Sequence, residues 1–348
     1  MANVTGADLR DYSTRLLAAG GYSSADAGAM ADLLVWANMR GVDSHGVLRI
    51  PRYVEMLDEG EAQAGHRMEV AQAFGAIRVI DADRAPGAVA MNRAVDEAID
   101  LSRDHGLGWC AVRRTSHAGA IGYFVERVAR SGRIGIAMTA SKPLMSYPGA
   151  RGEVLSTNPL AFGMPLGAGR EPLLFDMSTA AVALGKVMAA KDAGRAIPTG
   201  WAVDSAGVET TDASKVAALL PMAGPKGSGL SLMIEMLCSV LTLNPAIAPV
   251  LNGGKNGGFN GMVLALDPAA FGDADAVLAE AAELAEAIRQ RDPAPGVDRI
   301  RLPGERGYET ARKRGESGID LADGTVRRLA AMAQRLEVAI PSALALPG

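Results

Sequence analysis

The sequence predicts an α/β fold that begins with a purely helical unit. From about residue 74 onwards, short β-branched runs alternate with amphipathic helical segments, an order typical of a sheet covered by helices. Residues 6–60 show the helical period alone. The dinucleotide-binding pattern Gly-x-Gly-x-x-Gly is absent, so a Rossmann fold is not predicted. The Gly-x-Gly pairs that lack the third glycine are Gly106/Gly108, Gly167/Gly169 and Gly227/Gly229.

Three helices are predicted before residue 61. Two of them lie within residues 6–40, and Ser23 or Ser24 is the expected cap of the second. The third is predicted to begin near Val47. Pro51 then falls within or just past its first turn, where the missing N–H of proline costs little.

The core is predicted from the change of period after residue 74. The predicted strands are 76–80, 109–112, 134–138, 173–175, 262–266 and 300–302. The predicted helices are 87–104, 121–128 and 276–289, an apolar helix that opens at 224–229, and two short helices at the end of the chain. Two glycine-rich connections, 143–172 and 252–261, are predicted to be long loops, which in compact domains are usually functional.

Composition restricts the class of protein and of partner. With 348 residues, 49% hydrophobic and 21% charged, the chain has the balance of a globular protein with a large core. The formal net charge is -4, and no long basic run predicts a nucleic acid or a membrane surface as partner. The longest apolar stretch, 230–243, is interrupted by polar residues and is too short to span a bilayer.

The cysteines and the first residues predict the compartment. Cys110 and Cys238 each lie in an apolar run, so we expect buried thiols of a reducing compartment. The opening residues Met-Ala-Asn-Val-Thr-Gly contain neither the basic nor the apolar region of a signal peptide. The sequence therefore predicts a cytoplasmic protein.

The densest set of reactive side chains lies between Asp43 and Tyr53. Asp43 or Ser44 is the expected cap of the third helix, and Arg49 and Tyr53, four residues apart, then share one helical face. His45 stands just before that face, at the positive end of the helix. An acid/base group, a cation and a phenol would thus converge, which suits an anionic substrate undergoing proton transfer. The alternative is a capped helix with a solvated polar face.

A second polar cluster, Thr115–Phe124, follows the predicted strand 109–112. Ligands in α/β sheets gather at such strand ends. Gly119 and Ala120 leave room beside the imidazole of His117, which could take or return a hydroxyl proton during hydride transfer. The alternative is that His117 only caps the next helix.

A third cluster, Gly224–Leu230, places a lysine among three glycines at the start of a helix. Free backbone amides and the helix dipole would favour a phosphate there, and Lys226 would add a positive charge. The P-loop order of residues is absent. The alternative is a flexible entry into a buried helix.

These three clusters resemble the signatures of the type-2 malate/L-lactate dehydrogenase family, NAD(P)-dependent 2-hydroxy-acid oxidoreductases that lack the Rossmann fold. Its relatives include ureidoglycolate, sulfolactate and diketogulonate enzymes and cyclic-imine reductases. The resembling segments are Asp-Ser-His-Gly-Val-Leu-Arg-Ile-Pro-Arg-Tyr from Asp43, Ser-His-x-Gly-Ala-x-Gly-Tyr-Phe from Ser116, and Gly-Pro-Lys-Gly-x-Gly-Leu from Gly224. Ser156–Phe162, Phe175–Thr179 and Leu302–Glu305 resemble further family segments, so the likeness runs from about residue 43 to 305.

The resemblance implies a role for individual residues. His117 would be the catalytic acid/base, with His45 as the orienting partner fixed by Ser44. The implied substrate-binding residues are Arg49, Tyr53 and Lys142. The implied cofactor-binding residues are Ser141, Asn158, Asp176, Met177, Ser178, Lys226, Pro303, Gly304 and Glu305. Asp176 could accept from a ribose hydroxyl, or it could simply cap the end of its own strand.

The resemblance also implies an architecture. The expected fold is a mixed-sheet NAD(P)-binding core without a Rossmann site, joined to the N-terminal helical unit. The expected units are residues 1–70, helical and substrate-binding; 71–299, the core; and 300–348, a segment that packs back on the first unit. A homodimer, NAD or NADP as cofactor, and a small 2-oxo or 2-hydroxy acid as substrate are implied.

Some positions depart from the family pattern and bear on the alternatives. Gly185-Lys186 stands where cyclic-imine reductases carry an Asp, which argues against the alternative function, an NADPH-dependent reductase of piperideine- or pyrroline-2-carboxylate. Ser141-Lys142-Pro143 replaces a small-residue segment and Gly261 replaces a common His. We expect both changes to line the substrate pocket.

Two other enzyme classes are disfavoured by the sequence. A hydrolase triad needs side chains joined in space, whereas the consecutive residues Asp43, Ser44 and His45 point in different directions, and no Gly-x-Ser-x-Gly elbow is present. The four histidines show no metal-ligand spacing, so no metal site is predicted.

Overall fold

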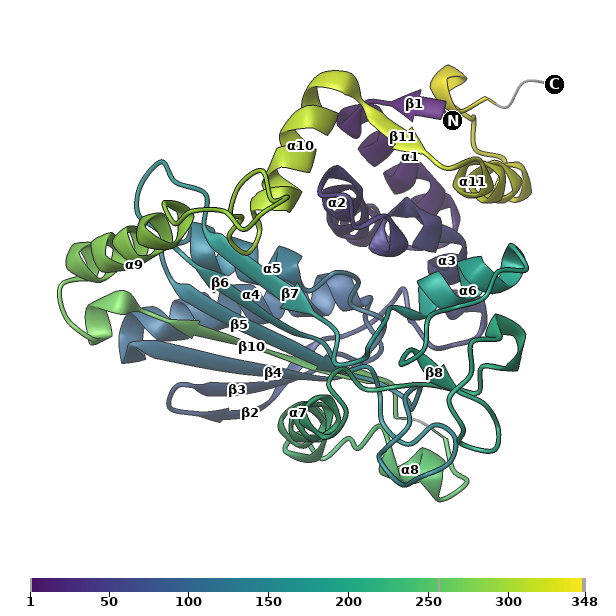
Figure 1. Ribbon diagram of the computed structural model, residues 1–348, viewed down its shortest axis with the longest axis horizontal. Helices are drawn as coiled ribbons and strands as arrows, with labels where there is room; N and C mark the ends of the chain where they lie inside the picture. Colours follow the sequence, from purple (N-terminus) through teal and green to yellow (C-terminus); the bar gives the residue numbers. More distant parts are fainter. Residues whose placement is uncertain (1, 256, 346–348) are drawn as a thin grey trace.

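A seven-stranded mixed sheet forms the centre of the molecule in the computed structural model, which describes residues 2–255 and 257–345 (Figure 1). Its strand order is β2-β3-β4-β10-β5-β6-β7, with β3 parallel to β4 and the other neighbouring pairs antiparallel. The strands are β2 (Glu69–Phe74), β3 (Ile77–Asp81), β4 (Leu107–Thr115), β5 (Ile134–Ala140), β6 (Leu160–Met164), β7 (Leu173–Met177) and β10 (Phe259–Leu266). The predicted mixed α/β class is confirmed.

Some of the helices pack on this sheet, and others form a separate group above it (Figure 1). The helices are α1 (Gly6–Ala19), α2 (Ser24–Met39), α3 (Ile50–Asp58), α4 (Gly87–His105), α5 (Gly122–Arg130), α6 (Leu184–Asp192), α7 (Pro225–Glu235), α8 (Ala248–Leu251), α9 (Ala274–Arg289), α10 (Glu305–Ser317) and α11 (Asp323–Arg335). A π-helical turn, Met236–Val240, continues α7. Two 3₁₀ turns, Asp43–His45 and Val47–Arg49, precede α3.

The two ends of the described chain lie together. Strand β1 (Ala2–Val4) pairs antiparallel with β11 (Ile319–Leu321), and α10 and α11 contact α2 and α3. Figure 1 shows α10 and α11 beside α1 and α2, above the sheet. A further small pair, β8 (Ala202–Val203) with β9 (Ala218–Leu219), lies outside the main sheet.

Local signals set several helix ends. Ser23, rather than Ser24, caps α2, because its hydroxyl accepts from the Asp26 N–H at 3.1 Å. Gly106 ends α4 in the left-handed region, with φ of 74°. Pro51 lies in the first turn of α3, as predicted, but α3 begins at Ile50 instead of Val47.

The prediction that Asp43 or Ser44 caps the third helix is wrong. No side chain caps α3. The Asp43 carboxylate is instead bound by Asn38 and Arg314, and the Ser44 hydroxyl lies against His45. Both oxygens are therefore unavailable to the first amides of the helix.

The two faces of the sheet are covered unequally. Helices α4 and α5 pack on one face, which we call the back face; an added Cβ at Gly108 would lie 2.1 Å from the Ala98 carbonyl oxygen of α4, so only glycine allows this approach. On the opposite front face, α7 covers Ala111, Met262 and their neighbours, which form an apolar cluster with Ile234 and Cys238. Among the described helices, α9 packs at the β7 edge of this face, beside Leu173, and no helix is drawn over the strands between α7 and α9 (Figure 1).

The short strands β1, β8, β9 and β11 were not predicted, and three predictions at the main sheet also differ from the structure. Strand β2 was not predicted because all its residues are exposed at the sheet edge and show no inward apolar pattern. Strand β6 lies inside the segment 143–172, which was predicted to be a loop. The predicted strand 300–302 is wrong: Pro303 follows it and has no N–H for a ladder, so only its carbonyl pairs with β7.

Other features agree with the expectations. Cys110 and Cys238 are both buried free thiols. Within the described residues, no helix has the length and apolar character needed to cross a membrane. The glycine-rich connection predicted at 252–261 gives way to β10 already at Phe259, and its residue 256 lies outside the described residues.

Candidate active site

Several predicted site residues lie at one edge of the sheet. The pairing makes β4, β5 and β7 run in the same direction, so their carboxyl ends meet at this edge, where β10 begins. His117 follows β4, Ser141 follows β5 and Ser178 follows β7. This is the place where ligands gather in α/β sheets.

The two histidine clusters come together here. The rings of His45 and His117 are stacked, with centroids 5.7 Å apart and planes 21° from parallel. The Tyr53 hydroxyl of α3 lies 2.9 Å from Nδ1 of His117. The Ser44 hydroxyl lies 3.0 Å from Nδ1 of His45. Two segments more than sixty residues apart thus share one group of polar side chains.

The surroundings of His117 determine which ring atom is free. The Gly119 N–H can only donate, and it donates to Nδ1 of His117 at 3.2 Å. A neutral His117 ring therefore carries its proton on Nε2. Burial raises the pKa of the Tyr53 phenol, so this hydroxyl keeps its proton. In the part of the chain that the structure describes, Nε2 of His117 has no hydrogen-bond partner.

Arg49 supplies positive charge to this group. Its Nε donates to the Ser44 carbonyl oxygen at 2.9 Å, and among the described residues its terminal nitrogens have no hydrogen-bond or ion-pair partner. Burial, with Arg49, lowers the pKa of His45 to about 4. Burial, His45 and Arg49 together lower the pKa of His117 well below its ordinary value. Both imidazoles are therefore neutral at neutral pH.

Phe259 is a residue of this group that the sequence analysis missed. Its ring meets that of His117 edge to face, with centroids 5.8 Å apart. The apolar pattern placed the strand start at Met262, whereas β10 begins at Phe259. The only available signal was an aromatic residue that follows a glycine-rich connection.

A second group of predicted residues surrounds the start of α7. Ser141 Oγ lies 2.7 Å from Ser156 Oγ, and Ser178 Oγ donates to the Thr157 carbonyl oxygen at 3.0 Å. Asn158 is fully buried and donates to the Ser231 carbonyl oxygen of α7 at 2.9 Å. Met177, at the end of β7, immediately precedes Ser178. These contacts join the ends of β5, β6 and β7 to α7.

The predicted cradle of free amides at Gly224–Leu230 is wrong. The N–H groups of Gly224, Lys226 and Gly227 donate to the carbonyls of residues 221, 223 and 222, and Pro225 has no N–H. The exposed Lys226 side chain, with no partner among the described residues, is what remains for an anion. An added Cβ at Gly227 would lie 2.2 Å from the Met222 carbonyl oxygen, so this glycine serves the tight turn.

Asp176 joins the end of β7 to the start of α5. Its Oδ2 accepts from the Gly122 N–H at the start of α5, at 2.8 Å, so it is not a cap of its own strand end. Burial raises the pKa of Asp176 to about 6, although Gly122 and Arg40 oppose the shift. The residue as a whole is nevertheless exposed.

These residues fit a dinucleotide. Asn158 Oδ1 and Thr179 Oγ1 are buried and lack hydrogen-bond partners within the described chain, which is costly unless a ligand or water satisfies them. Oδ1 of Asp176 also has no partner there, and Lys226 supplies a charge for a phosphate. A hydroxyl-rich, doubly phosphorylated molecule matches this donor and acceptor set.

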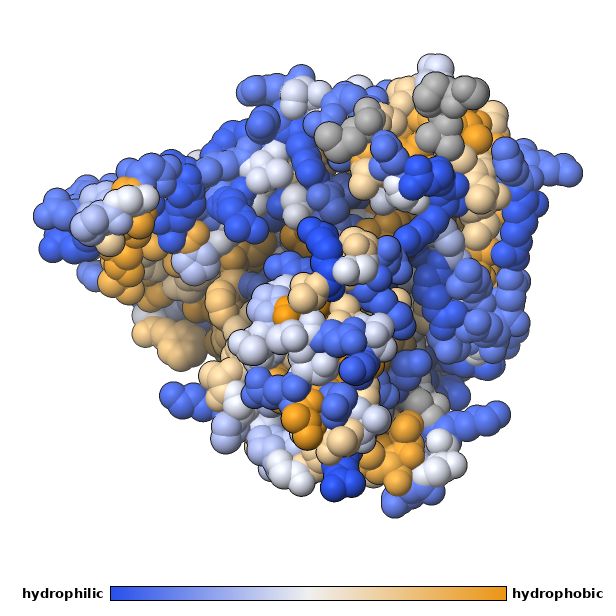
Figure 2. Space-filling view, turned by 45° about the vertical axis from the view of Figure 1, so that its right-hand side comes forward, coloured by the Kyte–Doolittle hydropathy of each residue, from blue (hydrophilic) through white to orange (hydrophobic). Residues whose placement is uncertain are grey.

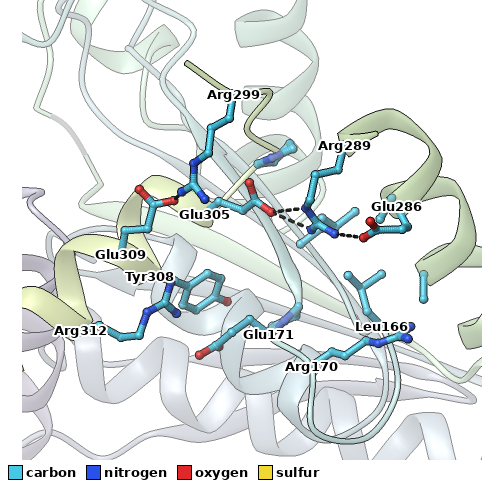
Figure 3. A pocket seen from close by; sticks show the side chains of 15 residues that line it. Leu166, Arg170, Glu171, Glu286, Arg289, Arg299, Glu305, Tyr308, Glu309 and Arg312 are labelled. Carbon is cyan, nitrogen blue, oxygen red and sulfur yellow. Dashed lines mark hydrogen bonds and ion pairs between the residues drawn. The ribbon is translucent and has the colours of Figure 1, made fainter. Parts of the chain in front are cut away.

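Pro303, Gly304 and Glu305 form a turn at the outer edge of β7. The Pro303 carbonyl accepts from the Leu174 N–H at 3.0 Å, and Gly304, with φ of 94°, packs so closely on Leu174 that a Cβ there would lie 2.9 Å from its Cβ. Glu305 accepts two bonds from Arg289 of α9. Figure 3 shows the cavity of about 440 Å³ beside this turn, lined by Pro303, Glu305, Tyr308, Arg170, Arg289 and Arg312.

Two predicted positions are not part of the histidine group. Lys142 is exposed and lies near Glu153, where it partly offsets the rise in the pKa of that carboxyl caused by burial. Gly261 does not line a pocket: an added Cβ there would lie 2.6 Å from Sδ of Met91, in the back-face core. By contrast, Gly185 of α6 lies beside Ser44, with an added Cβ 4.0 Å from its Cβ.

The geometry defines a class of protein before any comparison. A neutral histidine pair, a phenol and an arginine stand at the strand ends of a non-Rossmann α/β sheet, beside residues that fit a dinucleotide. These are the functional groups that an oxidoreductase needs to transfer a proton to or from an anionic substrate. The chain belongs to the malate/L-lactate dehydrogenase family, which it matches over residues 4–330.

Individual relatives span most of the chain. It is 36% identical to a ureidoglycolate dehydrogenase (NAD(+)) of Escherichia coli K12, over 85% of this chain and 86% of that one. It is 35% identical to a (2R)-3-sulfolactate dehydrogenase (NADP(+)) of Chromohalobacter salexigens, over 88% and 91%. The protein is thus a dehydrogenase of the 2-hydroxy-acid type, which uses a nicotinamide cofactor.

Solved structures share the fold. A malate dehydrogenase of Pyrococcus horikoshii OT3 superposes with a TM-score of 0.87 at 30% identity, covering 97% of this chain and 96% of that one. A delta1-piperideine-2-carboxylate reductase of Pseudomonas syringae superposes with a TM-score of 0.84 at 31% identity, covering 96% and 100%. The fold thus accommodates both chemistries, and the dehydrogenase function is the better supported for this chain.

The lowered histidine pKa values predict a pH-dependent stability. A group whose pKa is lower in the folded than in the unfolded chain binds fewer protons when folded, so stability is lost as the pH falls below its unfolded pKa. The free energy of unfolding should therefore fall between about pH 6.5 and pH 4. His45→Asn should make this fall less steep in urea unfolding series, whereas His105→Asn, at an exposed position, should not. Equal slopes for wild type and His45→Asn would contradict the assignment.

Proposed function

We propose that His117 is the acid/base residue of this 2-hydroxy-acid dehydrogenase. The observation that carries the proposal is the free Nε2 of a ring whose Nδ1 is held by Gly119 and Tyr53. When the ring is protonated, the Tyr53 oxygen can accept from Nδ1, because a phenol both donates and accepts. In reduction, the protonated ring gives its Nε2 proton to the substrate oxygen and keeps the proton on Nδ1, which donates to the Tyr53 oxygen in place of the Gly119 contact; in oxidation, this Nδ1-protonated neutral ring takes the hydroxyl proton at Nε2.

Arg49, Tyr53 and Lys142 bind the substrate in this proposal. The terminal nitrogens of Arg49 are free to form two parallel bonds with the carboxylate of a 2-oxo or 2-hydroxy acid. Tyr53 fixes His117, and Ser44 fixes His45, which closes the site from the side of the N-terminal helices. Lys142 would reach the far end of the substrate.

The cofactor in this proposal is NAD or NADP. When bound, its nicotinamide exchanges the hydride with the substrate carbon. Asp176 would accept from a ribose hydroxyl, and Lys226 would pair with a phosphate. The other residues proposed to line the cofactor site are Ser141, Asn158, Met177, Ser178, Pro303, Gly304 and Glu305.

The substrate is tested with a panel of 2-oxo acids. Oxaloacetate, pyruvate, oxalurate, sulfopyruvate and diketogulonate are assayed with NADH and with NADPH, alongside piperideine-2-carboxylate. Lys186 follows Gly185, the residue of α6 that lies beside Ser44, and adds positive charge where the imine reductases carry an acid, which favours an anionic oxo acid over the imine. Reduction of the imine alone would replace our proposal with the alternative.

His117→Ala is the sharpest test of the proposed acid/base. With the best substrate of the panel, kcat should fall by roughly 10²–10⁴, the usual scale of a lost proton-transfer group. Binding of the reduced cofactor, followed by its fluorescence, should stay nearly unchanged. If His45→Ala loses kcat and His117→Ala does not, the two histidines have exchanged roles.

Arg49→Lys tests the proposed carboxylate contact. A planar guanidinium pairs through two bonds and an ammonium does not, so KM for the oxo acid should rise by about tenfold while the cofactor dissociation constant stays the same. Steady-state kinetics and cofactor titration separate the two. A change in cofactor affinity alone would assign Arg49 to the dinucleotide.

Lys226→Ala tests the proposed phosphate contact. Loss of a charge-assisted bond should weaken cofactor binding by about 1.5–3 kcal/mol with little change in thermal stability. Isothermal titration with NADH and NADPH measures it, and Lys313→Ala, at an exposed lysine of α10, is the control. Unchanged affinity for both cofactors would remove Lys226 from the site.

We further propose that the protein is a homodimer that buries the open front face of the sheet. Six residues form one apolar row across neighbouring strands: Ile77, Trp109, Leu264, Ile136, Phe162 and Phe175. Three of them, Ile77, Phe162 and Phe175, are about two-fifths exposed. Figure 2 shows apolar surface in a hollow beneath α9. A second copy of the chain is the proposed cover, because a contiguous apolar row that is left exposed commonly marks a protein–protein interface.

Phe162→Glu should therefore yield a monomer in sedimentation velocity, while Val208→Glu, at an exposed apolar residue outside the row, should leave the dimer intact. A monomeric wild type would contradict the proposal.

The proposed compartment is the cytoplasm, supported by the two free buried thiols. The division into units 1–70, 71–299 and 300–348 likewise remains our proposal.

A further inference from the structure

The turn that carries Ser44 and His45 is held at both ends by one buried side chain. Asn38, near the end of α2, is 2% exposed. Its Nδ2 donates to Oδ1 of Asp43 at 2.7 Å, and its Oδ1 accepts from the N–H of Val47 at 2.8 Å. His45 therefore stands in the middle of a five-residue turn whose two ends share a single amide.

The turn packs on this amide without any free space. An added Cβ at Gly46 would lie 2.2 Å from Oδ1 of Asn38, closer than any side chain allows. Gly46 thus lets the backbone approach the amide, and the turn has no room to slide along it. A small displacement of Asp43 must consequently be passed on to Ser44 and His45.

Arg314, on the C-terminal helix α10, binds the same turn. Its two terminal nitrogens contact the two carboxylate oxygens of Asp43 at 2.8 and 3.2 Å. One of these nitrogens also donates to the carbonyl oxygen of Asn38. The Arg314 side chain is 20% exposed, so this two-bond contact is partly shielded from water.

Helix α10, which carries Arg314, is fixed to the N-terminal unit at its other end as well. Arg40 donates to the carbonyl oxygen of Gly304, at the N-cap of α10, and its guanidinium lies 3.9 Å from the centre of the Tyr308 ring. The helix is thus anchored at both ends to the segment that leads into the turn. Its position determines where Asp43 sits.

The orientation of His45 depends on this anchorage. The ring is fixed by Ser44 Oγ and stacks on His117, and the groups that face it are Arg49, Ser44 and His117. Ser44 and Arg49 belong to the turn and move with it, so of these contacts the stacking on His117 holds the ring from outside the turn. The contacts of Asp43 with Asn38 and Arg314 hold the turn itself, from α2 and α10.

We propose that Arg314 is a positioning residue for the reaction: by holding Asp43, it keeps the His45 ring against His117 and the Arg49 guanidinium at the substrate carboxylate. This inference rests on the proposed roles of His117 and Arg49. A residue of the C-terminal helix α10 thereby supports the reaction at the N-terminal turn that carries Ser44 and His45.

The test compares Arg314→Gln with Lys313→Gln, the neighbouring exposed cation of α10. In Arg314→Gln we expect kcat to fall by roughly 10–10²-fold, since small misplacements of catalytic groups cost this much, while cofactor affinity stays within about twofold. Arg314→Lys should recover part of kcat, because one of the two bonds can form again. Lys313→Gln should match the wild type.

A second readout does not depend on turnover. NMR titration of the imidazoles in the protein without cofactor should show the pKa of His45 rising from about 4 towards 6.5 in Arg314→Gln, because a loosened turn lets water reach the ring. Asp43→Asn, which keeps the shape of the side chain, should give the same shift and replaces Arg314→Gln if that variant does not fold. The double variant should be no worse than either single one.

Unchanged kcat and an unchanged His45 titration in Arg314→Gln would overturn the proposal. So would an equal loss in Lys313→Gln, or additive losses in the double variant. If the wild type turned over no oxo acid at all, the proposed function would fail, whereas the His45 titration would still decide whether Arg314 positions the turn.

Discussion

Two imidazole rings can stack 5.7 Å apart here because neither carries a charge. Burial and the guanidinium of Arg49 both disfavour the imidazolium form of each ring, and His45 further disfavours a charge on His117. The rings belong to different parts of the chain, one to a turn before α3 and one to the end of β4. The rest of the structure must therefore hold the N-terminal helices against the sheet closely enough to keep water away from both.

The C-terminal segment meets this requirement by packing against the N-terminal helices. Strand β11 pairs with β1, α10 packs on α2, and Arg40 ties the end of α2 to the turn at Gly304. Trp36 and Arg40 in turn reach Glu126 of α5, through a 2.6 Å hydrogen bond and a buried ion pair. A residue of the N-terminal helices thus contacts both the core and the C-terminal segment, so none of the three can shift without disturbing the site.

Short-range signals in the sequence predicted much of the fold, since Ser23 and Pro51 act where they stand. His117 was also predictable, as a polar cluster after a buried strand. What could not be predicted depends on partners far away in the chain. Arg314 binds Asp43 across more than 270 residues, so the carboxylate that was expected to cap a helix holds the turn before α3 in place instead.

The errors in the predicted amide cradle around Lys226 and in the predicted pocket position of Gly261 have a different physical origin. The glycines around Lys226 indicated free amides, but the backbone consumes those amides in its own tight turns, which no count of glycines reveals. Gly261 has a neighbour, Met91, that occupies the space where a side chain was expected. Composition indicates which residues are small, whereas the packing decides what fills the space beside them.

The electrostatics of the site link His117, the proposed acid/base residue, to the proposed substrate. With no anion nearby, burial and Arg49 hold the pKa of His117 well below its ordinary value. The ring is then neutral and lacks the second proton that it would give to the substrate oxygen. A carboxylate bound to Arg49 would cancel that positive charge and add a negative one beside the ring, and both effects raise the pKa. The proton needed for reduction would then be taken up only when an oxo acid occupies the site. A neutral ketone would produce no such change, which makes the carboxylate a part of the catalysis as well as of the recognition.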